Sequence, residues 1–298
     1  MSSEPVTRTS LPDISSIETT FRDGDGVSLH VVAAGDPGDP LVILLHGFPE
    51  YWYEFHDYIE PLVSAGYRVL VPDQRGYNRS EKPASFRSYR IRKLSGDIRA
   101  VIGSEDRDSA HVVGHDWGGA VGWDLALRHP EAVDRLGIVN APHPVVFKQV
   151  LRSNLTQLRR SWYMLLFQIP RLPEWLFRRW NYEPLISAMR ESSLPGAYTV
   201  TDFEQYRRAW AQEGALTGML NWYRAALRHS ENPPQERVQA STLLIWGDRD
   251  EALIPELAPK SINYCNEGRL EQFPDATHWI PHEYPERVSE LLLDHLEA

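Results

Sequence analysis

The feature that most constrains the fold is a glycine-rich hexapeptide, Gly114-His115-Asp116-Trp117-Gly118-Gly119. An apolar run that ends at Val113 precedes it, and a helical pattern that stops at His129-Pro130 follows it. In a sharp strand-to-helix turn, the two final glycines remove side chains that would collide with the crowded backbone. The central residue then projects above the edge of a sheet, so we expect a parallel sheet with flanking helices.

The centre of this turn carries an aspartate, whereas the commoner version of the turn carries a serine. A serine alkoxide suits attack on an acyl carbon. A carboxylate can instead open a strained or activated saturated carbon and leave an ester that water then cleaves. Asp116 therefore predicts hydrolysis through an alkyl-enzyme ester. The alternative is that Asp116 only caps the following helix, a position where aspartate is favoured.

Short apolar runs alternate with helical stretches along the chain, which is typical of a mostly parallel α/β sheet. The expected strands are 28–33, 41–45, 67–71, 111–113, 135–139, 241–246 and 270–273. Between residues 145 and 229 the pattern changes to aromatic-rich and arginine-rich helices. We therefore predict an α/β core in two parts, 1–144 and 230–298, with a helical cap at 145–229 between them. The chain is expected to end in a helix over 285–296.

Two backbone N–H groups are expected beside Asp116. The turn His46-Gly47-Phe48-Pro49-Glu50 follows the strand 41–45, and open α/β sheets bind their ligands at the carboxyl ends of strands. The N–H of Phe48, together with that of Trp117, would hold a developing oxyanion. The alternative is an ordinary glycine–proline loop.

An acid and a histidine follow the nucleophile in the chain order expected of this arrangement. Asp250 comes after the strand 241–246, and His278 comes after the strand 270–273. A histidine there can take a proton from water, while a buried carboxylate fixes its tautomer. Taken singly, both would be loop residues without a catalytic role, and Asp248 competes with Asp250 for the role of the acid.

These stretches resemble the epoxide hydrolases of the α/β-hydrolase superfamily, from about Ile17 to the C-terminus. Two further stretches match the family, Asp73-Gln74-Arg75-Gly76-Tyr77 and Asn140-Ala141-Pro142-His143-Pro144. The resemblance favours Asp250 over Asp248. Asn78 stands where the family has glycine, and because asparagine tolerates left-handed backbone we expect little consequence.

The resemblance implies a two-step reaction and two more site residues, Tyr163 and Tyr223 of the cap. Asp116 would attack an epoxide carbon while the two phenols hydrogen-bond to the oxygen and one of them supplies a proton. His278, steadied by Asp250, would then draw a proton from the water that releases a vicinal diol. The alternative for both tyrosines is packing, since a chain with 13 tyrosines and 10 tryptophans places many of them in its core.

An apolar pocket is expected around the site, which would favour aryl or alkyl epoxides. Its predicted lining is His46, Trp52, Trp162, Trp222 and Trp279. By resemblance, Glu50 would order the attacking water. The alternative for Glu50 is a solvated loop carboxylate.

Two rival functions share the fold. Hydrolytic dehalogenases use the same aspartate, acid and histidine, but haloalkane dehalogenases commonly have asparagine where Phe48 stands. Fluoroacetate dehalogenases have arginine where Trp117 stands. A ligand receptor without useful turnover would show a damaged triad or oxyanion loop. Neither signature is present, so both rivals rank below epoxide hydrolysis.

The composition of the chain restricts the kinds of partner that we expect it to bind. The net charge of −10 over 298 residues argues against nucleic-acid phosphate or an anionic membrane, and a homodimer is compatible with it. The 11 histidines show no metal-ligand spacing and phosphate-loop patterns are missing, so no metal or cofactor is expected. The first 25 residues lack the pattern of a secretory signal, and Cys265 is the single cysteine. We therefore expect a cytoplasmic protein.

Overall fold

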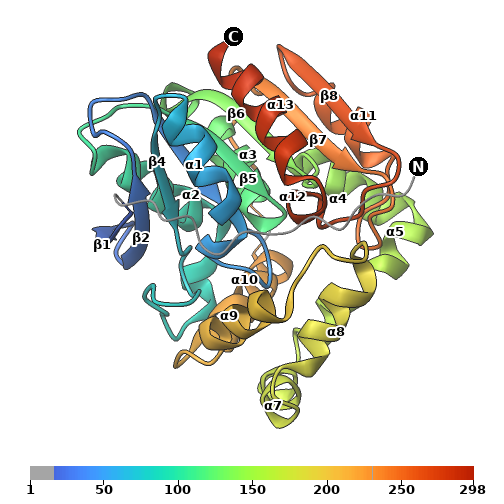
Figure 1. Cartoon of the computed structure of the whole chain (residues 1–298). Helices are drawn as coiled ribbons and strands as arrows, with labels where there is room; N and C mark the ends of the chain where they lie inside the picture. The colour runs from blue at the N-terminus through green and yellow to red at the C-terminus, as the bar shows by residue number, and fades with distance from the viewer. Residues whose placement is uncertain (1–16, 230) are drawn as a thin grey trace.

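The computed structural model describes residues 17–229 and 231–298. Within them, one sheet has the strand order β1-β2-β4-β3-β5-β6-β7-β8 (Figure 1). The strands β1 and β2, and β2 and β4, pair antiparallel, and all the other neighbours pair parallel. This is the mostly parallel sheet of the α/β-hydrolase fold. The strands are β1 (Glu18–Asp23), β2 (Ser28–Ala34), β3 (Leu41–Leu45), β4 (Arg68–Pro72), β5 (Ala110–His115), β6 (Val133–Val139), β7 (Ser241–Gly247) and β8 (Gly268–Phe273).

Helices cover both faces of the sheet because its central strands are apolar on both sides. In β3, Ile43 and Leu45 belong to one hydrophobic core, whereas Val42 and Leu44 belong to a second core on the other face. The first core includes residues of α2 (Ile91–Gly103) and α3 (Trp117–Arg128). The second includes residues of α1 (His56–Ser64) and α13 (Pro285–Glu297), which lie side by side in Figure 1.

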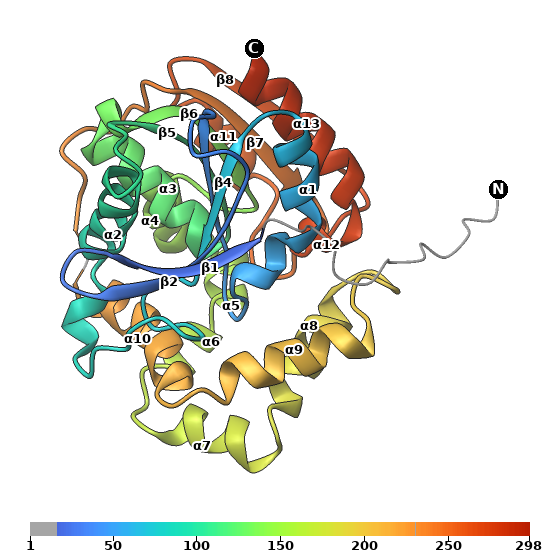
Figure 2. The same cartoon turned by 60° about the vertical axis from the view of Figure 1, so that its left-hand side comes forward.

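Helices fill the stretch between β6 and β7. They are α4 (Pro144–Ser153), α5 (Leu155–Arg160), α6 (Tyr163–Leu166), α7 (Leu172–Arg179), α8 (Glu183–Ser192), α9 (Val200–Trp210) and α10 (Ala215–Arg228). No strand occurs among the described residues of this stretch. Figures 1 and 2 show α7 to α10 gathered beyond one end of the sheet. The division of the chain at 144/145 and 229/230 stays a prediction.

One backbone contact fixes α10 against the sheet domain. Gly76 has a φ of +92°, and a Cβ atom added to Gly218 of α10 would lie 2.7 Å from the Gly76 Cα. Only glycine therefore allows the two backbones to come this close. Four residues further along α10, the indole N–H of Trp222 donates to the carbonyl oxygen of Arg75 at 2.9 Å. The loop after β4 thus sets the position of α10.

The sequence reasoning missed one strand, β1, whose residues are mostly exposed at the edge of the sheet. The remaining strands and the last helix were predicted with ends that differ by a few residues at most. The left-handed backbone expected at Asn78 is present, with a φ of +36°. The expectation about residues 1–25 falls in part on residues 1–16, which lie outside the described residues. Among the helices described, none combines the length and the apolar character needed to cross a bilayer.

Candidate active site

Asp116 lies in the tight turn between β5 and α3. Its φ of +48° and ψ of −117° are strained for a residue with a side chain. Glycine neighbours make room for this turn: a Cβ atom on Gly118 would collide with the carbonyl group of Leu45, and one on Gly114 would collide with the backbone of Gly118. The predicted turn is therefore present, and the Asp116 side chain accepts no capping hydrogen bond from the second or third residue of α3.

The oxyanion donors predicted from the sequence reach the Asp116 carboxylate. The N–H of Phe48 donates to Asp116 Oδ1 at 2.9 Å, and the N–H of Trp117 also bonds the carboxyl group. Gly47 allows this approach, because a Cβ atom there would lie 2.6 Å from the Cβ of Asp116. Burial raises the pKa of Asp116, and the positive His278 and the two N–H groups offset part of that rise. One carboxylate oxygen is thus held by the backbone, which leaves Oδ2 for chemistry.

His278 joins Asp116 to Asp250. Its Nδ1–H donates to Asp250 Oδ2 at 2.6 Å, and its Nε2 lies 3.6 Å from Asp116 Oδ2. Burial alone would lower the pKa of His278, but the charge of Asp250 and its hydrogen bond, followed by Asp116 and Glu50, raise it to about 9. The imidazole is therefore oriented by one carboxylate and faces the other.

Asp250 is held by a residue that the sequence reasoning did not assign to the site, Asn140. Its Nδ2 donates to Asp250 Oδ2 at 2.7 Å, and its Oδ1 accepts the Gly247 N–H at 2.8 Å. Asn140 follows β6 with a φ of +41°, a conformation in which asparagine is common. Burial would raise the pKa of Asp250, but His278, Asn140 and the N–H of Leu253 hold it below its usual range. The signal for Asn140 was available, because it opens one of the stretches that match the family.

The competing acid, Asp248, lies outside this network. It accepts a hydrogen bond from Gln272 at 2.8 Å. The structure thus places Asp250, and not Asp248, against His278.

The two cap tyrosines lie near enough to the nucleophile to sense its charge. Tyr163 of α6 and Tyr223 of α10 have ring centroids 5.8 Å apart and share a side-chain hydrogen bond. The Tyr223 ring lies 5.1 Å from the rings of both Phe48 and Trp117. Burial and the nearby charge of Asp116 raise the pKa of both phenols above the ordinary value. Both hydroxyls are therefore proton donors at neutral pH.

The predicted pocket residues separate into two groups. Trp222 and Trp279 lie beside the site: the Trp222 ring is 5.6 Å from that of Trp117, and the Trp279 ring is 5.2 Å from that of His278. His46 is buried beneath the oxyanion loop, where its Nδ1–H donates to the Gly47 carbonyl at 3.0 Å and its Nε2 accepts the Gln74 N–H.

The other two predicted pocket residues, Trp52 and Trp162, have different surroundings. Trp52 packs against Tyr51 and Tyr53 in the short helix η1 (Trp52–Phe55). Trp162 is 63% exposed, because the neighbouring Met164 and Phe167 take the inward face of this segment. The prediction that Trp162 lines a pocket stays a prediction, and its exposed position does not support it.

Glu50 is not the solvated loop carboxylate that the sequence left as an alternative. It is 1% exposed, and its Oε1 accepts hydrogen bonds from Tyr206 at 2.5 Å and from His282 at 2.7 Å. Burial alone would raise the pKa of Glu50, but His282, His115 and Tyr206 hold it at about 2. Glu50 therefore carries a permanent negative charge at the end of the oxyanion loop, residues 46–50.

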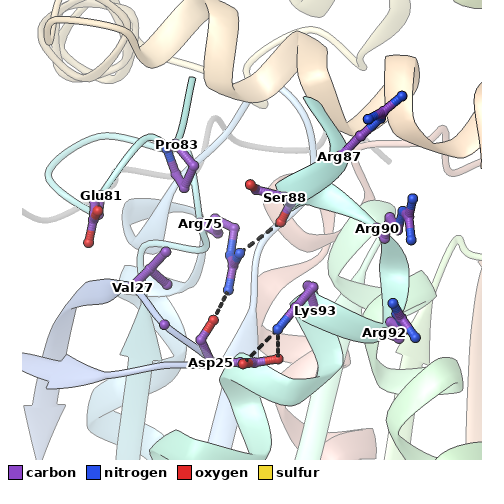
Figure 3. Close-up of a pocket in the computed structure, with 11 residues that line it drawn as sticks. Asp25, Val27, Arg75, Glu81, Pro83, Arg87, Ser88, Arg90, Arg92 and Lys93 are labelled. Atoms are coloured by element: carbon purple, nitrogen blue, oxygen red, sulfur yellow. Dashed lines mark hydrogen bonds and ion pairs between the residues drawn. The ribbon is translucent and has the colours of Figure 1, made fainter. Parts of the chain in front are cut away.

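A hollow of about 540 Å³ lies elsewhere, between the β1–β2 turn, the loop after β4 and the start of α2 (Figure 3). Four of its five basic side chains, all except Arg87, are paired with acidic ones among the described residues. Arg75 binds Asp97 at 2.6 Å, and Lys93 binds Asp25 at 2.8 Å. These ion pairs hold the loop after β4 in place. We therefore assign no ligand to the hollow.

Comparisons with known proteins agree with this geometry. A family model described as the alpha/beta hydrolase fold matches residues 40–285. The chain is 44% identical over 283 residues to the AB hydrolase superfamily protein YfhM of Bacillus subtilis, across 94% of this chain and 98% of that protein. It is 31% identical over 313 residues to Epoxide hydrolase A of Mycobacterium tuberculosis, across 92% of this chain and 95% of that protein.

A solved structure shows the same likeness. The crystal structure of Bacillus megaterium epoxide hydrolase in complex with an inhibitor matches with a TM-score of 0.85 at 30% identity, across 94% of this chain and 100% of that one. The chain therefore belongs to the α/β-hydrolase superfamily and, within it, to the epoxide hydrolases.

Proposed function

We propose that this protein hydrolyses epoxides to vicinal diols through a covalent ester on Asp116. One observation carries the proposal: a carboxylate at a strand-to-helix turn lies near two cap phenols, Tyr223 buried and Tyr163 partly buried, and near a histidine that is paired with a second carboxylate. The phenols stabilise an alkoxide, and the histidine serves the hydrolysis of an ester.

The first step uses the free oxygen of Asp116. Oδ2 attacks an epoxide carbon, the C–O bond of the ring breaks, and its electron pair stays on oxygen as an alkoxide. Tyr163 and Tyr223 hydrogen-bond to that oxygen, and one of them transfers its proton. The raised phenol pKa keeps both protons in place until the alkoxide forms.

The second step uses the bonds that already surround Asp116. His278 Nε2 takes a proton from water, and the hydroxide adds to the carboxyl carbon of Asp116. The developing oxyanion is Oδ1, which the N–H of Phe48 already binds, and the N–H of Trp117 bonds the same carboxyl group. Collapse of this intermediate breaks the bond between the carboxyl carbon and Oδ2. The imidazolium of His278 returns its proton to the leaving oxygen, the diol departs, and the carboxylic acid left on Asp116 gives up the proton that restores the phenol.

The test separates the two steps. In His278→Gln, alkylation of Asp116 should proceed while hydrolysis stops, so the intact mass of the protein should rise by the mass of one epoxide. In Asp116→Ala, neither adduct nor diol should form, with the circular dichroism spectrum unchanged. Styrene oxide and an alkyl epoxide serve as substrates, and release of halide from haloalkanes is measured beside them. Diol formation by Asp116→Ala would refute the mechanism.

A further inference from the structure

Three buried polar atoms beneath the active site converge without a hydrogen-bond partner in the described part of the chain: Glu50 Oε2, Glu54 Oε1 and His115 Nδ1. His115 Nδ1 lies 2.9 Å from Glu54 Oε1 and 3.7 Å from Glu50 Oε2. All three side chains are 0% exposed. Burying polar atoms without hydrogen-bond partners costs free energy. The cluster therefore requires a proton, which the positions of the heavy atoms do not show.

The tautomer of His115 shows what is missing. His115 Nε2 lies 2.9 Å from the carbonyl oxygen of His278, which can only accept, so Nε2 carries a hydrogen. Burial, reinforced by the neighbouring His278, lowers the pKa of His115 to about 3, so the ring is neutral and Nδ1 bears a lone pair. Lone pairs on Nδ1 and on two carboxyl groups therefore face one another, and a proton must lie between them.

Glu54 is the group best suited to carry that proton. Burial and the neighbouring Glu50 raise its pKa, because two adjacent buried carboxylates cannot both be ionised. Glu50 is the ionised member, since the charge of His282 and its hydrogen bond lower the pKa of Glu50. The titratable groups around the cluster of Glu50, Glu54 and His115 are His46, Tyr77, Asp116, Tyr198, Tyr206, His278 and His282.

We propose that Glu54 is a positioning residue, held as a neutral carboxylic acid whose Oε1–H donates to His115 Nδ1. Its other oxygen accepts the Gly47 N–H at 2.8 Å. One side chain thus joins the oxyanion loop to His115, which in turn holds the backbone of His278. The catalytic part of this inference rests on the proposed function, whereas the protonation does not.

Glu54→Gln provides the test, because a glutamine can donate to His115 Nδ1 and accept from Gly47 without a charge. We expect infrared difference spectra to lose one carboxylic-acid C=O band in Glu54→Gln, and to lose none in the exposed control Glu267→Gln. Turnover of epoxide should stay within about twofold of the wild type. Glu54→Ala leaves both partners unpaired and should slow ester hydrolysis about tenfold, with alkylation little changed.

Three results would overturn the proposal. They are an unchanged acid band in Glu54→Gln, a loss of ester hydrolysis in Glu54→Gln as large as in Glu54→Ala, and a stoichiometric divalent cation that Glu54→Gln releases. Because the infrared band does not depend on turnover, failure of the proposed function would leave this reading intact.

A separate observation concerns the outer surface of the cap. Of the 11 large apolar side chains exposed among the described residues, eight lie between residues 155 and 180. They are Leu155, Leu158, Trp162, Leu165, Ile169, Leu172, Trp175 and Trp180. The first six recur at intervals of three and four residues, which places those of α5 and α6 along one face of nearly continuous helix. We call these eight residues the cap apolar surface.

Basic residues alternate along the sequence with those of the cap apolar surface. Between residues 145 and 182 the sequence has seven lysines and arginines and a single acidic residue, Glu174, which is buried and paired with Arg224. Five of the arginines are exposed and form no ion pair among the described residues: Arg152, Arg159, Arg171, Arg178 and Arg179. The overall charge of −10 therefore conceals a strongly positive region.

From this surface we infer that the cap binds an anionic lipid bilayer. Protruding tryptophans and leucines among arginines match the interfacial region of a membrane, where rings and aliphatic chains enter the acyl boundary and guanidinium groups meet phosphates. A symmetric dimer through this face would bring like charges together, which costs free energy. The charge thus favours a negatively charged occupant over a second copy of the chain.

The test is co-flotation of the full chain with vesicles. We expect binding to phosphatidylglycerol vesicles at low salt, weaker binding at high salt, and little binding to phosphatidylcholine vesicles. Arg178→Glu with Arg179→Glu should weaken binding by more than about twentyfold, since each arginine near an anionic surface contributes about fivefold. The matched control reverses two exposed arginines outside the cap, Arg99→Glu with Arg287→Glu, and should bind as the wild type does.

Paired apolar variants complete the design. Trp175→Ser with Trp180→Ser should weaken vesicle binding, whereas Val200→Ser, which removes another exposed apolar side chain, should not. Turnover of a water-soluble epoxide should be unchanged in all these variants. Absence of binding to phosphatidylglycerol vesicles, or a dimer in sedimentation that the Trp175 and Trp180 changes dissociate, would overturn the inference.

Discussion

At the scale of single residues, Asp116 and His278 titrate as a linked pair. The negative charge of Asp116 is one of the causes that raise the pKa of His278 to about 9. In the resting enzyme at neutral pH, the ring is therefore positive and holds Asp116 ionised. Esterification removes the charge of Asp116, so the pKa of His278 falls at the stage when the ring must accept a proton from water.

Asp116→Asn reproduces this loss of charge without substrate. We expect the pKa of His278 to fall below about 9 in this variant, followed by NMR titration of its imidazole protons. Asp250→Asn should lower the pKa further, because the charge of Asp250 is the largest of the causes that raise it. An unchanged pKa in Asp116→Asn would show that the two groups are not coupled.

The phenol pair gives a second prediction for single residues. Tyr163→Phe and Tyr223→Phe should each slow alkylation of Asp116 by about 10- to 100-fold, because each removes one hydrogen bond to the alkoxide. The double variant should block alkylation altogether. Single-turnover mass spectrometry measures this step, with Tyr284→Phe as the control. A double variant that alkylates normally would assign the protonation to another donor.

At the scale of elements, the sequence predicted what local pattern encodes. Strands buried on both faces, such as β3 and β7, give continuous apolar runs and were found within a residue or two. The exposed edge strand β1 gives no such run. Glu54 lies in a short helix whose sequence does not indicate burial, so its pairing with His115 depends on tertiary packing. The outward direction of Trp162 depends likewise on which face of its segment meets the core.

The contact between Gly76 and Gly218 gives the prediction for elements. Gly218→Ala should destabilise the protein by about 1–3 kcal/mol and lower turnover, because its Cβ would push α10, and Tyr223 with it, away from Asp116. Gly103→Ala in α2 is the control, since no atom lies within 4 Å of its added Cβ. That change should leave stability equal or raise it. Thermal unfolding and steady-state kinetics measure both effects, and equal melting temperatures for the wild type and Gly218→Ala would contradict the prediction.

At the scale of the whole molecule, one hydrophobic core joins cap and sheet. Trp210 of α9 and Ile186 of α8 belong to the same buried cluster as Leu29 of β2 and Ile43 of β3. We therefore expect a single cooperative unfolding transition. Tryptophan fluorescence and far-ultraviolet circular dichroism should give coincident denaturation curves. An early fluorescence transition would indicate that the cap unfolds on its own.

The close approach of Gly76 and Gly218 also limits how this scaffold can be re-engineered. Because the backbone of α10 is in direct contact with the loop after β4, α10 cannot shift to admit a bulkier molecule without breaking this contact. Room for larger guests must come from trimming the rings that surround the reactive carboxylate, such as Phe167, whose centroid lies 5.0 Å from that of Tyr223. Libraries aimed at a broader choice of guests should therefore vary those rings and spare both glycines.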